Sequence, residues 1–180
     1  MIREIKGQCV SLRLVTLDDA GFIVGLRNKP NNALFINKTT TDIAQQIDWM
    51  KNEFKDSASF YFIILDKSET PIGTVSLYNI RRSRGEFGRW ICNGSALESL
   101  ESALIIHQYA FSVLDLQSVY TRTLESNVKV VSFHRNFGAS VSNVPYFDSE
   151  YGHNVVKGVV DAAMFPSIST RCNKIIGALL

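Results

Sequence analysis

Cysteine is scarce in this sequence, and its three residues, Cys9, Cys92 and Cys172, lie far apart. None forms the C-x-x-C pair of a structural zinc site or stands in a cysteine–histidine ligand pattern, so we expect no bound metal. An odd number of distant thiols also argues against a disulfide framework. Reduced thiols of this kind fit a cytoplasmic protein best.

Long apolar runs are missing as well. The first residues, MIREIKG, lack the hydrophobic stretch of a signal peptide, and no segment reaches the roughly 20 apolar residues that span a membrane. The 19 basic and 17 acidic residues leave a formal net charge of +2, which is too small to indicate nucleic acid or a membrane surface as the partner. We therefore expect neither nucleic acid nor a membrane as a partner.

The hydrophobic patterns that are present predict a single α/β domain over residues 1–180. The chain is long enough to bury one core, and it contains no repeat, linker or low-complexity segment. Periods of two and 3.6 residues mark the expected elements. Strands are expected at 8–16, 60–65, 72–80, 86–92, 117–124, 140–147 and 154–165, and helices at 17–27, 41–54, 98–114 and 127–137. The segment from Pro166 onward has no clear period and receives no assignment.

The segment from Tyr120 to Ala139 carries the most specific signal. A strand leads into a polar turn with Asn127, and the helix that follows is closed by Gly138. This arrangement resembles the end of the acetyl-CoA-binding core of the GNAT N-acetyltransferase superfamily, where the pattern is N-x-x-(S/A)-x-x-(L/F)-(Y/H)-x-x-x-G-(F/A). The matching residues are Asn127, Phe133, His134 and Gly138, and Val130 replaces the small residue.

The resemblance implies a GNAT fold of the α/β (α+β) class. This fold has a mixed, mostly antiparallel central sheet of about seven strands, flanked by four helices and splayed in the middle. The expected element order matches it across nearly the whole chain. The resemblance also implies an acetyl-CoA-dependent N-acetyltransferase. In this superfamily the strands corresponding to 86–92 and 117–123 diverge, and the pantetheine arm of the cofactor lies in the gap like an added strand.

By the same resemblance, the cofactor is bound by the end of strand 86–92, the loop and helix start after it, and the turn before the last helix. The expected residues are Trp90, Ile91, Cys92, Gly94, Ser95, Ser99 and Asn127. The loop departs from the family's (R/Q)-x-x-G-x-(G/A) pattern, because it has no basic residue and places Glu98 and Glu101 close to the expected phosphates. Helix capping by Ser95 or Ser99 explains these serines equally well.

Two residues are candidates for proton transfer. Glu86 begins strand 86–92, where many relatives carry a carboxylate, and we expect it to take a proton from the acceptor amine directly or through water. The alternative for Glu86 is an ion pair with a neighbouring arginine. His134 stands where many relatives have a tyrosine that protonates the leaving thiolate, and an imidazole titrates near neutrality. The alternative for His134 is a structural role in the core.

The acceptor side is predicted from Arg27 and Asn28. This pair resembles the W-R-N signature of the ribosomal-protein and nucleotide-amino-sugar acetyltransferase branches, with Leu26 in place of tryptophan. If so, Arg27, Arg81, Arg82 or Arg89 is expected to meet a nucleotide diphosphate. Phe35 and Trp90 are expected to stack on a base or line the cleft, although core packing would also account for both. The expected substrate-binding residues are therefore Arg27, Asn28, Phe35 and Arg89.

The first-choice acceptor is thus the amine of an amino-sugar nucleotide, bound by a monomer or a homodimer. A protein N-terminus, as in the ribosomal-protein branch, or a polyamine is the second choice. The alternative from another class is a catalytically silent GNAT-like binding module. The glycine-poor loop with Glu98 and Glu101 favours that alternative.

Overall fold

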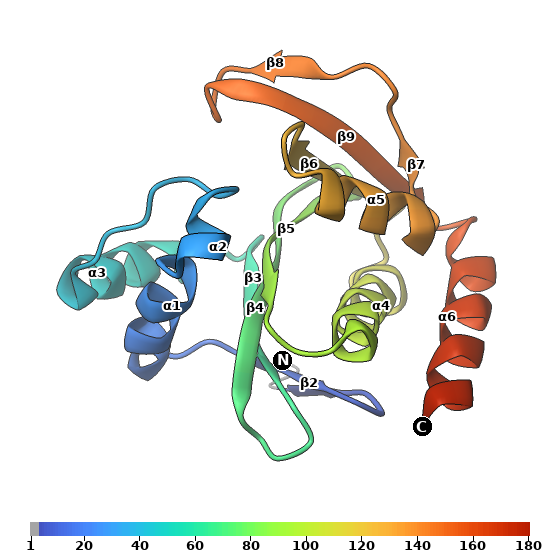
Figure 1. Ribbon diagram of the computed structural model, residues 1–180, viewed down its shortest axis with the longest axis horizontal. Coiled ribbons are helices and arrows are strands. Elements are labelled where there is room, and N and C mark those ends of the chain that lie inside the picture. Colours follow the sequence, from blue (N-terminus) through green and yellow to red (C-terminus); the bar gives the residue numbers. More distant parts are fainter. Residues whose placement is uncertain (1–3) are drawn as a thin grey trace.

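A mixed β-sheet forms the centre of the described residues, 4–180, in the computed structural model (Figure 1). Its nine strands are β1 (Glu4–Lys6), β2 (Ser11–Leu14), β3 (Phe60–Leu65), β4 (Pro71–Arg81), β5 (Arg84–Cys92), β6 (Ser118–Leu124), β7 (Ser140–Val141), β8 (Tyr146–Asp148) and β9 (His153–Asp161). Their order is β1-β2-β3-β4-β5-β6-β9-β7, and β8 also pairs with β9. Neighbouring strands are antiparallel except β5 and β6, which are parallel.

Helices cover both faces of this sheet. They are the 3₁₀ helix η1 (Leu17–Asp19) and the α-helices α1 (Ala20–Arg27), α2 (Pro30–Ala33), α3 (Ile43–Glu53), α4 (Ala96–Ser112), α5 (Val128–Phe137) and α6 (Phe165–Leu179). In Figure 1, α1, α2 and α3 lie on one side of β3 and β4, and α4 and α6 lie on the other. The sheet is therefore covered on both faces in its middle.

Strand β3 shows how one segment contributes to both cores. Phe62 and Ile64 pack in the larger core with α4 and α6, whereas Tyr61 and Ile63 pack in the smaller core with α1 and α3. Successive side chains of a strand point to opposite faces, so a strand covered on both sides needs apolar residues throughout. The sequence of β3, FYFIIL, is apolar throughout and so meets this requirement.

The sheet opens between β5 and β6. Their parallel ladder contains Arg84↔Ser118, Gly85↔Val119 and Glu86↔Tyr120, and within the described residues it ends there. Beyond this point β6 stays paired with β9 as far as Leu124↔Val155, while β5 turns away. The splay that the resemblance implied is therefore confirmed.

A β-bulge in β5 accompanies this divergence. On β4, Thr74 pairs with Ile91 and Ser76 pairs with Gly88, so Val75 lies opposite two residues of β5. One of these residues, Arg89, has a φ of 49°, in the left-handed region. The Thr74 hydroxyl donates a 2.9 Å hydrogen bond to the Arg89 carbonyl and holds the bulge. An extra residue bends its strand, and here it directs β5 away from β6.

The predicted fold class is confirmed, with more elements than expected. The described residues form nine strands and six α-helices, where about seven and four were expected. The expected strand 140–147 is divided into β7 and β8, because Ser142 and Val144 form a turn through the Ser142 hydroxyl. The expected strand 154–165 ends at Asp161. No helix in the described part of the chain is long and apolar enough to cross a membrane.

The segment from Pro166, which the sequence left without an assignment, forms most of helix α6. Phe165, Ile168, Cys172 and Ile176 are its buried residues, and their spacing of three or four places them on one face of the helix. Pro166 is tolerated because it lies in the first helical turn, where the backbone N–H has no intrahelical partner. Helix α6 therefore completes the larger core against α4.

Replacing Ile176 with alanine should lower the free energy of unfolding by about 2–5 kcal/mol, because the truncation leaves a cavity under α6. Ile176 is fully buried, whereas its neighbour Ile175 is 40% exposed and provides the matched control. Ile175→Ala should cost less than about 1 kcal/mol. Chemical denaturation of both variants measures the difference, and equal losses would contradict the packing of α6 on α4.

Candidate active site

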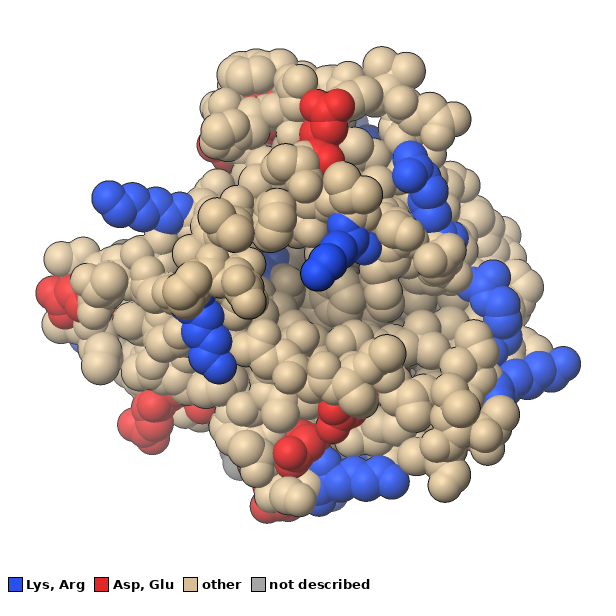
Figure 2. Space-filling view, in the orientation of Figure 1, with Lys and Arg blue, Asp and Glu red and all other residues tan. Residues whose placement is uncertain are grey.

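A cleft of about 610 Å³ lies where β5 and β6 diverge. Figure 2 shows a hollow at the centre of the viewed face with basic side chains on its rim. The lining residues come from the end of α1, the loop between α2 and α3, α3, the central strands, α5 with the residue before it, and the turn before β9. They are Arg27, Phe35, Ile36, Asn37, Lys38, Thr39, Thr40, Gln45, Gln46, Trp49, Tyr61, Tyr78, Phe87, Gly88, Arg89, Trp90, Arg122, Thr123, Leu124, Asn127, Val130, His134, Glu150 and Tyr151.

The cleft brings together about half of the residues that the sequence suggested for the site. Those that line it are Arg27, Phe35, Arg89, Trp90, Asn127 and His134. Those that lie outside its lining are Glu86, Asn28, Ile91, Cys92, Gly94, Ser95 and Ser99. Ile91 and Cys92 are paired with Thr74 and Gly73 in the β4–β5 ladder.

Glu86 is buried at the point where the β5–β6 ladder ends, with only 1% of its surface exposed. Arg122 donates to both carboxylate oxygens at 2.9 Å, from Nε to Oε1 and from Nη2 to Oε2. The Tyr78 hydroxyl donates to Oε1 at 3.1 Å and the Asn79 amide donates to Oε2 at 2.9 Å. Four donors occupy the roughly four lone-pair positions of a carboxylate.

Glu86 thus forms an ion pair, but it is buried and its partner is Arg122 of β6, not one of the arginines close to it in sequence. A role for Glu86 as the base stays a prediction. In this geometry an incoming proton could reach the carboxylate only by displacing one of its donors. We assign Glu86 instead to positioning, because it holds Arg122 and Tyr78 in place.

Arg122 is the centre of a larger cluster of charges. Besides Glu86, it contacts Asp148 at 3.0 Å and Glu150 at 2.7 Å through Nη1, and its guanidinium lies 4.8 Å from the centre of the Tyr151 ring. Burial opposes the charge of Arg122, but the hydrogen bonds to these carboxylates outweigh it and raise its pKa. Arg122 was not among the residues expected from the sequence, although an arginine in a buried strand needs a charged partner.

His134 lies in the cleft wall on α5, among aromatic rings. Its ring centre is 5.7 Å from that of Phe87 and 6.3 Å from that of Trp90. Burial, followed by the charge of nearby His107, lowers the pKa of His134 to about 3. The expectation that this imidazole titrates near neutrality is therefore wrong for the ligand-free protein. A role as proton donor to the thiolate stays a prediction, and it would require a bound anion to raise the pKa.

Two further residues that line the cleft have structural partners. Asn127 caps α5, because its side-chain oxygen accepts a hydrogen bond from the Val130 amide at 3.3 Å. Trp90 donates from its indole nitrogen to the Ser102 hydroxyl at 3.1 Å, and its ring centre lies 4.5 Å from that of Phe133. Both residues are thus held firmly in the cleft wall.

The start of α4 is closed by a capping box. The Ser95 hydroxyl accepts from the Glu98 amide at 3.2 Å, and the Glu98 carboxylate accepts from the Ser95 amide at 2.6 Å. The capping alternative is therefore confirmed for Ser95. Glu101 does not face the expected phosphates, because its buried carboxylate accepts hydrogen bonds from the amides of Gln8, Cys9 and Val10. Of these two glutamates, only Glu98 therefore places its carboxylate at the start of α4.

On the acceptor side, Arg27 and Asn28 have different roles. Arg27 lines the cleft and donates from Nε to the Thr39 hydroxyl at 2.6 Å, and burial lowers its pKa. Asn28 donates to the carbonyls of Val24 and Thr40, and so connects the loop between α2 and α3 to the end of α1. The structure therefore gives Asn28 a supporting role.

Arg89 lines the cleft with its charge already paired. Its guanidinium donates to Glu53 at 2.6 Å and lies 4.3 Å from the centre of the Tyr78 ring and 4.9 Å from that of Trp49. Cation–π contacts and a close carboxylate hold this side chain against α3. A diphosphate would have to compete with Glu53 for it.

Comparisons with known proteins were consistent with this fold. Residues 10–140 match the family model for the acetyltransferase (GNAT) domain. A comparison with curated protein sequences found no match.

Several solved structures are similar over most of the chain. One described as apo FdhC, a nucleotide-linked sugar GNAT, is 29% identical, with a TM-score of 0.78 over 93% of this chain and 95% of that one. A GCN5-related N-acetyltransferase from Brucella melitensis is 15% identical, with a TM-score of 0.80 over 97% and 86%. Spermidine N-acetyltransferase from Vibrio cholerae, in complex with CoA and spermine, is 18% identical, with a TM-score of 0.77 over 87% and 98%.

Glu86→Gln should lower the free energy of unfolding by about 3–5 kcal/mol, because it removes one charge of a buried pair and leaves Arg122 poorly compensated. Glu150→Gln is the matched control, since its side chain is 69% exposed although it contacts the same guanidinium. It should cost about 1 kcal/mol or less. Urea titration of both variants measures the two losses, and equal values would argue against Glu86 as the anchor of Arg122.

The free energy of unfolding should fall as the pH drops from about 6.5 to about 4. Burial lowers the pKa of His107 to about 4 and that of His134 to about 3, so in this range the unfolded chain binds protons that the folded chain does not. Each of these two histidines contributes its full stabilisation only above about pH 6.5, which is the pKa of histidine in the unfolded chain. In His107→Leu, the free energy of unfolding should change across this range by on the order of 3 kcal/mol less than in the wild type. His153→Gln, at an exposed site, should leave this change as it is in the wild type. Thermal melts across this range measure both slopes.

Proposed function

The chain belongs to the GNAT acetyltransferase family, and we propose that it transfers an acetyl group from acetyl-CoA to a primary amine held in the cleft between β5 and β6. The observation that carries this proposal is the divergence of the two strands after Glu86↔Tyr120. It leaves backbone groups of β5 from Phe87 onward without partners in β6. An extended amide-containing chain can pair with such groups as an added strand does.

The residues around the opening fit such a cofactor. The free edge of β5 would bind the pantetheine amides, with Asn127 and Trp90 on either side of the cleft. The first amides of α4 would hold the pyrophosphate, where the helix dipole favours an anion. Glu98 competes for one of these amides and would have to move aside. When bound, acetyl-CoA supplies the activated thioester.

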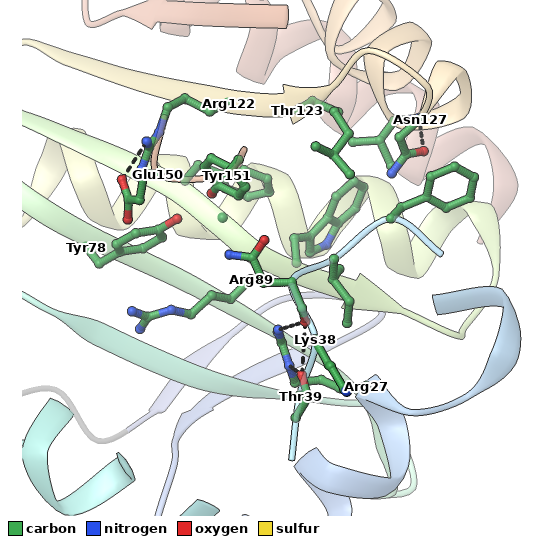
Figure 3. A pocket seen from close by; sticks show the side chains of 18 of the residues that line it. Arg27, Lys38, Thr39, Tyr78, Arg89, Arg122, Thr123, Asn127, Glu150 and Tyr151 are labelled. Atoms are coloured by element: carbon green, nitrogen blue, oxygen red, sulfur yellow. Dashed lines mark hydrogen bonds and ion pairs between the residues drawn. The ribbon is translucent and has the colours of Figure 1, made fainter. Parts of the chain in front are cut away.

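The acceptor half of the cleft has opposite charges at its two ends. In Figure 3, Glu150, Tyr78 and Tyr151 lie near Arg122 at one end, while Arg27, Lys38 and Thr39 lie at the other. A molecule with an ammonium group at one end and phosphate at the other would match both. An amino-sugar nucleotide has this chemistry, and the likeness to a nucleotide-linked sugar GNAT supports the same choice.

A polyamine is the second candidate. The similar fold of a spermidine N-acetyltransferase suggests it, and the carboxylates around Arg122 would attract a cationic substrate. The basic end of the cleft argues against it, because Arg27 and Lys38 would repel the far end of a polycation. A protein N-terminus remains a third acceptor to be tested.

With acetyl-CoA as donor, CoA thiol release should be fastest with amino-sugar nucleotides, compared with free amino sugars, spermidine and peptides. Lys38→Met should raise the KM for the nucleotide acceptor roughly tenfold, equivalent to about 1.4 kcal/mol of lost phosphate contact. It should leave the KM for acetyl-CoA and for the free amino sugar unchanged. Lys55→Met is the control, because this exposed lysine lies outside the cleft.

Equal rates with the free sugar and its nucleotide would argue against phosphate recognition, and preference for spermidine would favour the second candidate. A thermal shift tests the donor separately. Acetyl-CoA at a hundredfold excess over its Kd should stabilise the protein by about 2.7 kcal/mol. The absence of any shift would indicate the catalytically silent binding module.

A further inference from the structure

Acetylation of an amine needs a group that takes its proton, because an ammonium ion has no lone pair for attack. The four donors on Glu86 make it a poor candidate. Glu150 is the one acidic residue in the lining of the cleft, counted over the described part of the chain. Its side chain is 69% exposed, against 1% for Glu86 and 9% for Asp148.

Glu150 is exposed and yet held in a defined position. Its carboxylate receives a 2.7 Å hydrogen bond from Nη1 of Arg122. Its backbone is fixed by Asp148, whose side chain accepts from the amides of Glu150 and Tyr151 at 2.9 and 3.1 Å. The Asp148 carbonyl also accepts from the Gly152 amide at 2.8 Å. Hydrogen bonds to Arg122 and within the turn 148–152 thus hold Glu150 in the lining of the cleft.

The charges around Glu150 favour an incoming cation. Three carboxylates, those of Glu86, Asp148 and Glu150, share the single guanidinium of Arg122, so the cluster carries two negative charges in excess. The hydroxyls that surround it come from tyrosines whose pKa is raised, chiefly by burial, so they stay neutral. They are Tyr78, Tyr120, Tyr146 and Tyr151. An ammonium group would therefore be attracted to this end of the cleft.

Glu150 is the most accessible carboxylate of the cluster. A proton on Glu86 would break a buried bidentate pair, and a proton on Asp148 would weaken its contact with Arg122. A proton on Glu150 removes only a partly solvated contact. The second oxygen of Glu150 has no hydrogen bond from another side chain among the described residues. This oxygen is available to a substrate or to one bridging water.

We propose that Glu150 is the proton acceptor of the acetyl transfer, which rests on the function proposed above. The acceptor ammonium gives one proton to the Glu150 carboxylate, directly or through one water, and becomes a free amine. Its nitrogen then forms the N–C bond with the thioester carbonyl as the C–S bond breaks. The second proton leaves this nitrogen and neutralises the departing thiolate, and Glu150 returns its own proton to solvent.

The test is the pH profile of Glu150→Gln, with the best acceptor of the panel. At pH 7 the variant should lose about 10²-fold in kcat/KM for the acceptor, within the usual range for general-base catalysis. The loss should shrink as the pH rises above the pKa of the acceptor amine, because the amine is then already deprotonated. The KM for acetyl-CoA should not change, and the free energy of unfolding should fall by no more than about 1 kcal/mol. Glu69→Gln, at an exposed turn far from the cleft lining, is the control.

Two results would overturn this role. Wild-type rates in Glu150→Gln would exclude it, and so would an equal loss at every pH, which indicates a structural effect. Both results require an active wild-type protein. If the wild type releases no CoA with any acceptor, the proposed function itself fails, and the role of Glu150 fails with it.

Discussion

The buried ion pair between Glu86 and Arg122 is the interaction on which the open sheet depends. It lies at the last ladder pair of β5 and β6, so it joins the two strands where backbone pairing stops. Two guanidinium hydrogen bonds, each 2.9 Å, replace the backbone bonds that a continuous sheet would have made. Beyond this point the bulge at Arg89 turns β5 away. The Glu86–Arg122 ion pair therefore closes one end of the cleft, and the bulge at Arg89 opens the rest of it.

The same arginine organises the acceptor side of the cleft. Its ion pairs with Asp148 and Glu150 fix the turn 148–152 before β9, and its guanidinium packs against the Tyr151 ring. Tyr78 reaches the cluster from β4 and lies against Gly88, where a Cβ atom would come within 2.7 Å of its hydroxyl. The β4–β5 hairpin, β6 and the turn before β9 thus meet around one charge. Buried charges of this kind require good geometry, which restricts how these elements can be arranged.

Local patterns predicted most of the fold, while the site depends on contacts that a single sequence does not reveal. The apolar run of β3 and the Ser95-x-x-Glu98 capping box are local signals, and the structure contains both. Helix α6 was missed because short polar residues separate its buried positions, although Phe165, Ile168 and Cys172 have helical spacing. The pairing of Glu86 with Arg122, 36 residues away, follows from strand order, which only the family resemblance suggested. The structure also corrects the expected titration of His134, because its surroundings, Phe87 and Trp90 of β5 and His107 of α4, are distant from it in sequence.

The contact of Glu101 with the first hairpin has a consequence for the order of assembly. Three successive amides between β1 and β2, those of Gln8, Cys9 and Val10, are satisfied by one carboxylate more than 90 residues later in the chain. Buried amides without a partner are costly. During synthesis, the β1–β2 hairpin therefore cannot reach its native hydrogen bonding until Glu101 has been made. The folding of this hairpin must thus wait for a helix that lies on the far side of three further strands in the sequence.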